Sequence, residues 1–300
     1  MRTVNIKQVD AFTNKAFSGN PAGVVINADA LNENDMLSIA REMNLSETAF
    51  VLKPSEDGAD YKVRFFSPVK EVDLCGHATI AAVHVLAEEG KFFLREPVTT
   101  ISFETKVGVL PVEIHFSDGA IKRIMMSQPK PSYAAFEGKI NEVSTILGIE
   151  EPEIDGDLEI VSTGLPSLVV PIKKLNALKK VEPNFNELKR FCKKIGASIL
   201  VFTFETISPL AMVHIRFFAP TLGVFEDPVT GTANGALGAY LIKNNLLHGN
   251  SPITILAEQG YSLNRPGEVT IELYFSNSRV DMVKVGGKSV TVMEGDLFLT

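Results

Sequence analysis

The sequence has few of the features that mark exported or membrane-bound proteins. Only two of its 300 residues are cysteines, Cys75 and Cys192, which is too few for a disulfide framework or a typical zinc site. No apolar run reaches the roughly 18–20 residues of a membrane span, and the first residues lack the apolar core of a signal peptide. We therefore expect a cytoplasmic protein with reduced thiols.

Positive charge is also scarce. The 29 Lys and Arg residues against 36 Asp and Glu residues give a net charge of −7, and no basic run is interleaved with aromatic residues. This balance argues against nucleic acid as a partner. A small anionic substrate remains compatible with it, because local backbone dipoles can bind one anion whatever the net charge.

What the sequence does contain is an internal repeat. The segment RFFSP at 64–68 returns as RFFAP at 216–220, an offset of 216 − 64 = 152 residues. Each copy leads through a turn with glycine, Gly76 or Gly231, into an apolar helix. A weaker echo relates NPAGVV at 20–25 to LPSLVV at 165–170. Two copies in the same order indicate that the chain arose by duplication.

The repeat predicts the fold. Both helices, expected at 77–89 and 232–244, are apolar on nearly every side, so a curved sheet should surround each one. We predict an α+β fold of two pseudo-symmetric domains, each a mixed β-sheet barrel wrapped around a central α-helix. The first domain would span residues 1–120 with a C-terminal strand at about 287–300, and the second would span 121–286.

The two helix N-termini form the first candidate site. Their backbone N–H groups and the positive end of the helix dipole favour an anion, and Gly76 and Gly231 let a ligand approach the backbone. Pseudo-twofold symmetry would make the two termini face one cleft, suited to a small carboxylate or a developing enolate. The alternative is that both glycines only make tight turns.

Three side chains near these turns carry useful chemistry. Asp227 precedes the second helix, where an N-cap role is the alternative. His77 begins the first helix, and no third ligand accompanies His77 and His84, so we expect no metal. Glu47 stands between a helix and an apolar strand, where burial would suit it to carry protons near neutral pH. The alternative for Glu47 is a solvated loop residue.

Cys75 occupies the first turn itself. A helix N-terminus activates a thiolate, so Cys75 is a candidate base. Its partner in the repeat is Thr230, however, so the pair of thiols used for inversion at a carbon centre is missing.

These segments together resemble the PhzF family of phenazine-biosynthesis-type isomerases and epimerases. The motifs run in order along the chain: DAFT at 10–13, FSGNPAGV at 17–24, NLSETAF at 44–50, RFFSP at 64–68, LCGHAT at 74–79, FAP at 218–220 and EDPVTGTA at 226–233. The resemblance implies a fold similar to diaminopimelate epimerase and chemistry without cofactor or metal. The founding member of the family is a homodimer that shifts a proton within a small cyclohexadiene amino acid.

By motif match, the resemblance implies that Glu47 is the acid/base and that His77 and Asp227 line the same catalytic site. Serine is commoner than threonine at the position of Thr232, so Thr232 keeps the hydroxyl but narrows the pocket. The resemblance implies that Gly231 and Thr232 bind substrate, and we expect Asn20 and Gly76 to bind it as well.

We therefore expect a cofactor-independent isomerase or epimerase that moves a proton on a small carboxylate-bearing metabolite in the interdomain cleft. We expect it to form a homodimer, with no metal, no nucleic-acid partner and no membrane association. Two alternatives stay open: a two-base amino-acid epimerase that uses Cys75, and a small-metabolite-binding protein without turnover.

Overall fold

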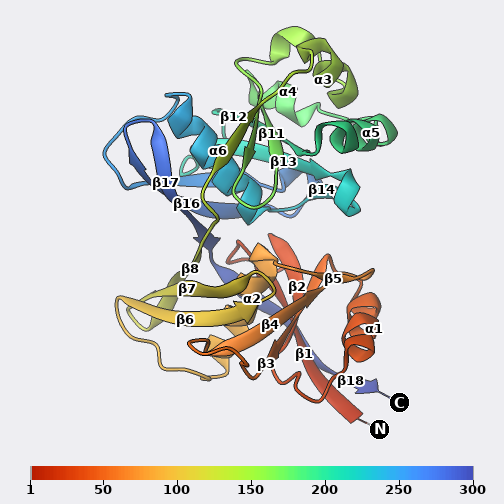
Figure 1. Cartoon of the computed structure of the whole chain (residues 1–300), viewed down its shortest axis with the longest axis vertical. Coiled ribbons are helices and arrows are strands. Elements are labelled where there is room, and N and C mark those ends of the chain that lie inside the picture. Colours follow the sequence, from red (N-terminus) through yellow and green to blue (C-terminus); the bar gives the residue numbers. More distant parts are fainter. Residues whose placement is uncertain (1, 300) are drawn as a thin grey trace. The chain divides into compact units, whose positions relative to one another are not determined.

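The computed structural model describes residues 2–299, and the chain divides into two compact units (Figure 1). The first unit comprises Met1–Ser127 and Gly286–Thr300, and the second comprises Gln128–Val285. From the sequence we placed the division near residue 120. In the structure β8 (Ala120–Ser127) pairs with β7 (Gly108–Ser117), and this hairpin carries the first unit on to Ser127.

The sheet of the first unit is mixed. Its strand β1 lies between β18 and β2 and is antiparallel to both. Strand β2 runs parallel to β3, β3 antiparallel to β4, and β4 parallel to β6, which forms a hairpin with β7. The short β5 also pairs with β4. The bounds are β1 (Arg2–Ala11), β2 (Asn20–Val25), β3 (Glu47–Leu52), β4 (Tyr61–Phe66), β5 (Glu71–Val72), β6 (Val98–Thr105) and β18 (Ser289–Leu299).

The second unit repeats this order of strands. Its β10 lies between β9 and β11 and is antiparallel to both. Strand β11 runs parallel to β12, β12 antiparallel to β13, and β13 parallel to β15, which forms a hairpin with β16. The short β14 pairs with β13 as β5 does with β4. The bounds are β9 (Ser132–Ala135), β10 (Glu159–Ser162), β11 (Ser167–Pro171), β12 (Ser198–Thr203), β13 (Val213–Ala219), β14 (Val224–Asp227), β15 (Ile253–Gln259), β16 (Gly267–Ser276) and β17 (Arg279–Gly287).

One buried helix occupies the centre of each unit: α2 (Gly76–Glu88) in the first and α6 (Gly231–Lys243) in the second. Helix α2 contacts the neighbouring strands β1, β2 and β3 and also β8, which lies far from them in the strand order. The sheet therefore curves around the helix. Helix α6 likewise contacts β10, β11 and β16. A Cβ at Gly238 would lie 2.9 Å from side-chain atoms of β16, which explains why α6 is rich in glycine and alanine. The predicted two-unit α+β fold is confirmed.

Further helices cover the outer faces of the sheets. In the first unit, α1 (Glu33–Met43) buries Met36, Ile39 and Ala40 against strand residues, and its Asn32–Asp35 capping box fixes where it begins. The second unit uses α3 (Ile140–Leu147), α4 (Leu175–Lys179) and α5 (Phe185–Ile195). Short 3₁₀ turns are η1 (Glu151–Glu153), η2 (Pro220–Leu222) and η3 (Tyr261–Leu263). Among residues 2–299, no helix combines the length and apolar character that a membrane span requires.

The repeat extends to side-chain contacts. Arg64 forms a bidentate pair with Glu71 at 2.7 and 2.9 Å, and Arg216 forms the same pair with Glu226 at 2.9 and 2.9 Å. Each guanidinium carbon also lies 5.1 Å from the ring centre of the phenylalanine two residues later. The arginine of each RFF motif therefore forms an ion pair, here called the arginine clamp, that links β4 to β5 in the first unit and β13 to β14 in the second.

Candidate functional site

Glu47 and His77 lie close together in the first unit. Glu47 is the first residue of β3, three residues after α1 ends at its C-cap Asn44. Its Oε2 lies 3.4 Å from Nε2 of His77, in the first turn of α2, and their side chains are 19% and 9% exposed. A carboxylate and an imidazole at this distance, mostly withdrawn from water, form a pair that can hold or move a proton.

His77 has two further neighbours. Its Nε2 lies 3.3 Å from Ser46 Oγ, and its Nδ1 lies 3.4 Å from Cys75 Sγ. The imidazole therefore bridges Glu47 and Cys75. Reasoning from the sequence did not predict the contact of His77 with Ser46 or with Cys75. Both neighbours lie within two residues of a proposed site residue, and this proximity is the only signal of them in the sequence.

The N-terminus of α2 has no side-chain cap. Its N-cap is Cys75, whose side chain makes no capping hydrogen bond, while Thr79 Oγ1 donates to the Cys75 carbonyl at 2.7 Å. A Cβ at Gly76 would meet only Met126 Sδ, at 3.8 Å, within residues 2–299. Packing does not demand glycine at position 76, so there is room there for a ligand to approach the backbone.

Asn20 lies on the same face of the sheet as Glu47. It begins β2, whose Ala22 pairs with Glu47 in parallel register, and residues two apart on a strand share a face. The loop before it is tightly held, since the buried Asp10 carboxylate accepts the Phe17 N–H at 2.6 Å. Asn20, like Glu47, therefore projects from a fixed part of the sheet.

Asp227 belongs to the second unit, where it ends β14. The N-cap of α6 is Thr230, and the Thr230 hydroxyl donates to Asp227 Oδ2. Asp227 is therefore not the helix cap, and its carboxylate is oriented by the cap residue instead. Thr232 lies in the first turn of α6, where it is partly exposed and its carbonyl accepts a hydrogen bond from Thr163 Oγ1 at 2.9 Å.

A buried amide pair supports this turn. The side chain of Gln259, 1% exposed, accepts the Thr230 N–H at 3.1 Å and donates to the Asp227 carbonyl at 2.9 Å. Asn234, fully buried, donates to Gln259 at 3.0 Å and to the Thr230 carbonyl at 2.9 Å. Sequence reasoning missed both residues. The one signal for Asn234 was an amide within the apolar sequence of α6.

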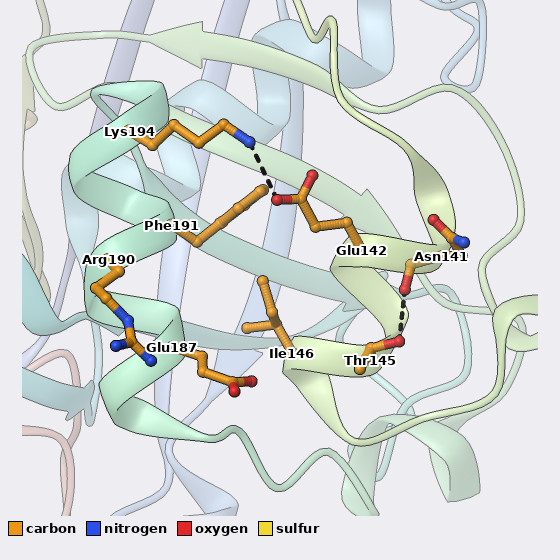
Figure 2. A pocket seen from close by; sticks show the side chains of 8 residues that line it. All are labelled: Asn141, Glu142, Thr145, Ile146, Glu187, Arg190, Phe191 and Lys194. Atoms are coloured by element: carbon orange, nitrogen blue, oxygen red, sulfur yellow. Dashed lines mark hydrogen bonds and ion pairs between the residues drawn. The ribbon is translucent and has the colours of Figure 1, made fainter.

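The predicted residues are absent from the surface groove between α3 and α5 (Figure 2). This groove has a volume of about 440 Å³, and Lys194 pairs with Glu142 across it at 3.1 Å. It is also lined by Glu187 and Arg190, whose side chains are exposed to solvent. Charges in open solvent are poorly suited to controlled proton transfer, so we do not place the catalytic site there.

Comparisons with known proteins agree with this description. The family described as PhzC-PhzF, phenazine biosynthesis-like protein, matches residues 9–295. A protein of Clostridium acetobutylicum named as an uncharacterized isomerase is 37% identical, with 100% of this chain and 99% of that protein covered. The isomerase YfhB of Bacillus subtilis, also named as uncharacterized, is 38% identical, with 95% and 96% covered.

Solved structures extend the likeness. A PhzF-family protein of Bacillus anthracis superposes with a TM-score of 0.91 at 33% identity, with both chains covered completely. A hydroxyproline epimerase of Agrobacterium vitis, solved with bound trans-4-hydroxy-L-proline, superposes with a TM-score of 0.63 at 13% identity, with 99% of this chain and 91% of that chain covered. At that identity the likeness concerns the fold alone.

Proposed function

The chain belongs to the PhzC-PhzF family of phenazine biosynthesis-like proteins, and from this premise we propose that it is an isomerase whose Glu47 moves a proton on a small carboxylate-bearing metabolite. The observation that carries the proposal is the 3.4 Å contact between Glu47 Oε2 and His77 Nε2. Relatives that cover the chain end to end are named isomerases, which supports the reaction class.

In the proposed reaction, the Glu47 carboxylate takes a proton from a carbon next to a carbonyl or carboxyl group. The electrons of the broken C–H bond move onto the neighbouring oxygen and form an enolate. The protonated Glu47 then returns the proton to another carbon, which gives isomerisation. Epimerisation requires protonation of the opposite face, either by Glu47 after the enolate turns over or by a second acid. Positioned acid/base groups of this kind typically contribute about 10²–10⁴-fold.

His77 would orient Glu47. With its proton on Nε2, the imidazole donates toward the carboxylate, and its Nδ1 then accepts from the thiol of Cys75, 3.4 Å away. A donor directed at one carboxylate oxygen leaves the other oxygen for the substrate carbon. His77 is therefore proposed as the group that fixes the direction of proton transfer.

Substrate binding is proposed for backbone groups and for polar side chains. The N-terminus of α2 at Gly76 would bind a carboxylate or a developing enolate, because its N–H groups and dipole favour negative charge. Asn20 would hydrogen-bond the substrate from the face of the sheet that carries Glu47. From the second unit we propose Asp227, Gly231 and Thr232.

Isotope exchange tests the proposal. The protein would be incubated in D₂O with a panel of small carboxylates and amino acids, and deuterium incorporation followed by NMR. We expect exchange by the wild type and a loss of at least about 10²-fold in Glu47→Gln. Glu187→Gln, in the groove of Figure 2, is the matched control and should keep the full rate. Undiminished exchange in Glu47→Gln would show that Glu47 is not the base.

One observation favours a second mechanism. Cys75 Sγ lies beside His77 Nδ1, an arrangement that activates thiols, so Cys75 could act as a second base of an epimerase. The position equivalent to Cys75 in the second unit is Thr230, which speaks against paired thiols. Cys75→Ser separates the two mechanisms, because a two-base enzyme loses epimerisation in this variant as it does in Glu47→Gln, whereas an enzyme with Glu47 as its single base keeps its activity.

A further inference from the structure

Three metal-binding side chains converge in the first unit. One donor atom from each of Glu47, Cys75 and His77 lies within 4.8 Å of the other two. His77 Nε2 lies 3.4 Å from Glu47 Oε2 and 3.9 Å from Cys75 Sγ. The sequence offers only His84 as a companion ligand for His77, whereas folding places Glu47 and Cys75 beside it.

The donor set matches one class of ion. A carboxylate, a thiolate and an imidazole are the ligands of zinc, with bond lengths of about 2.0–2.3 Å. Two ligands of a tetrahedral ion with such bonds lie about 3.3–3.6 Å apart. The separation of 3.4 Å between Glu47 and His77 matches these values. Cys75 Sγ lies 3.9 Å from His77 Nε2 and 3.4 Å from Nδ1, so its side chain would have to rotate toward Nε2 to complete the site. Hard ions such as Mg²⁺ prefer oxygen ligands and do not suit this set.

We propose that Glu47, Cys75 and His77 form a binding site for zinc or a similarly soft divalent cation, and that the bound ion inhibits the enzyme. Three protein ligands leave a fourth position for water or for a substrate oxygen. The ion would occupy the carboxylate of Glu47 and thereby remove the base from the reaction. The inhibition rests on the proposed function of Glu47, whereas binding of the ion does not.

The second unit provides an internal comparison. The positions equivalent to Glu47, Cys75 and His77 are Ser198, Thr230 and Thr232, all of which carry hydroxyls. Neutral hydroxyls are weak ligands for zinc. The fold by itself therefore does not create the site, because its three ligands are present in one copy only. We expect one ion per chain.

Cobalt provides a direct test, because Co²⁺ in a zinc site with a thiolate ligand shows a strong thiolate-to-metal charge-transfer band. The full chain would be treated with EDTA, desalted and titrated with Co²⁺, then with Zn²⁺ in competition. We expect one equivalent of Co²⁺ to produce the band, Zn²⁺ to abolish it, and Mg²⁺ to have no effect.

Variants locate the site. Cys75→Ser should lose the band, and Glu47→Gln should keep it while the affinity falls by at least about tenfold. Cys192→Ala is the matched control and should keep the band, because Cys192 lies in the core of the second unit. Absence of the band in the wild type, or its loss in Cys192→Ala alone, would overturn the proposal. If Cys75→Ser does not fold, an unchanged affinity in Glu47→Gln overturns it instead.

Turnover separates this proposal from the proposed function. Exchange by protein that has been treated with EDTA and desalted should stop on addition of one equivalent of Zn²⁺ and return when excess chelator is added. If the metal-free protein shows no exchange, the proposed function fails while the cobalt band still decides the metal site. Exchange that persists at full rate with the site occupied would refute the inhibition.

Discussion

Glu47 and Ser198 occupy the same position in the two copies of the fold. Each begins a strand that pairs in parallel with the preceding strand, Glu47 opposite Ala22 and Ser198 opposite Ser167. In each copy the following residue pairs with the last phenylalanine of the RFF motif. One frame therefore presents a carboxylate in the first unit and a small hydroxyl in the second, so the proposed proton carrier is not duplicated.

The contact between Glu47 and His77 predicts non-additive kinetics. We expect His77→Gln to lower the rate of exchange about 10–10²-fold, and the double variant with Glu47→Gln to be no slower than Glu47→Gln alone, because the two residues act as one unit. The measurement is deuterium incorporation by each variant. His84→Gln is the control, because His84 lies about two turns further along α2, and this variant should retain exchange. Additive losses would mean that His77 acts independently of Glu47.

The hydrogen bonds of the buried Gln259 side chain should stabilise the turn between Asp227 and Thr230. In Gln259→Leu, the Thr230 N–H and the Asp227 carbonyl lose their buried partner, so we expect a loss of about 2–3 kcal/mol in unfolding free energy. Urea denaturation measures the loss. Thr105, the equivalent residue of the first unit, donates to the Gly108 carbonyl and accepts from the Val107 N–H, both in exposed positions, so Thr105→Val should cost less than about 1.5 kcal/mol. Equal losses of unfolding free energy in the two variants would show that the hydrogen bonds of Gln259 do not stabilise the turn between Asp227 and Thr230.

Gly19, in the loop before Asn20, should not tolerate replacement by a residue with a Cβ atom. Gly19 has a φ of +60°, and a Cβ there would lie 2.1 Å from the Ala11 carbonyl oxygen. Gly19→Ala should therefore destabilise the protein by at least about 3 kcal/mol, because strain and a backbone clash add together. Gly58 also has a positive φ, +85°, but has no atom within 4 Å of its Cβ position, so Gly58→Ala should cost about 1 kcal/mol. Thermal unfolding of the two variants provides the comparison.

Replacing the arginine of each clamp should lower the unfolding free energy by different amounts in the two units. The Arg216 side chain is 8% exposed and also donates to the carbonyls of Leu178 and Val181, whereas that of Arg64 is 22% exposed. Lysine cannot reproduce the bidentate pair. We expect Arg216→Lys to cost about 2–4 kcal/mol and Arg64→Lys about 1 kcal/mol, by chemical denaturation. A larger loss in Arg64→Lys would contradict this ranking by burial.

The buried carboxylate of Glu104 should make the stability of the folded protein depend on pH in the acidic range. Burial alone would raise the pKa of Glu104, but hydrogen bonds from Lys62, from the Ser55 hydroxyl and from two backbone N–H groups lower it to about 2 from 4.5. A lowered pKa in the folded state stabilises the protein above pH 4.5, and this contribution disappears as the pH falls from about 4.5 to about 2.

Unfolding free energies measured across that pH range test this prediction. Glu104→Gln should be less stable than the wild type by about 2 kcal/mol at pH 7, with a smaller difference near pH 2. Glu258 accepts backbone N–H groups of the corresponding loop in the second unit, so Glu258→Gln should behave in the same direction. A difference that stays constant with pH would exclude the Glu104 carboxylate as its source.

Much of the fold was accessible from the sequence, because its signals are local. The RFF repeat, the glycine turns and the two apolar helices predicted the duplication, and the helices begin only one residue earlier than expected, at Gly76 and Gly231. Helix α1 (Glu33–Met43) has signals of the same local kind, since its capping box and apolar spacing are encoded within a few neighbouring residues.

The surroundings of the candidate site were not accessible in this way. The residue types Glu47, His77 and Cys75 are visible in the sequence, but the 3.4 Å contact of Glu47 with His77 depends on where β3 begins relative to the first turn of α2. The support of Asp227 by Gln259 joins residues 32 positions apart through a sheet pairing. Sequence alone determined the repeat, the elements and the candidate groups, because short-range propensity and pattern encode them. Tertiary structure alone decided which groups touch, because register and packing bring distant atoms within bonding distance.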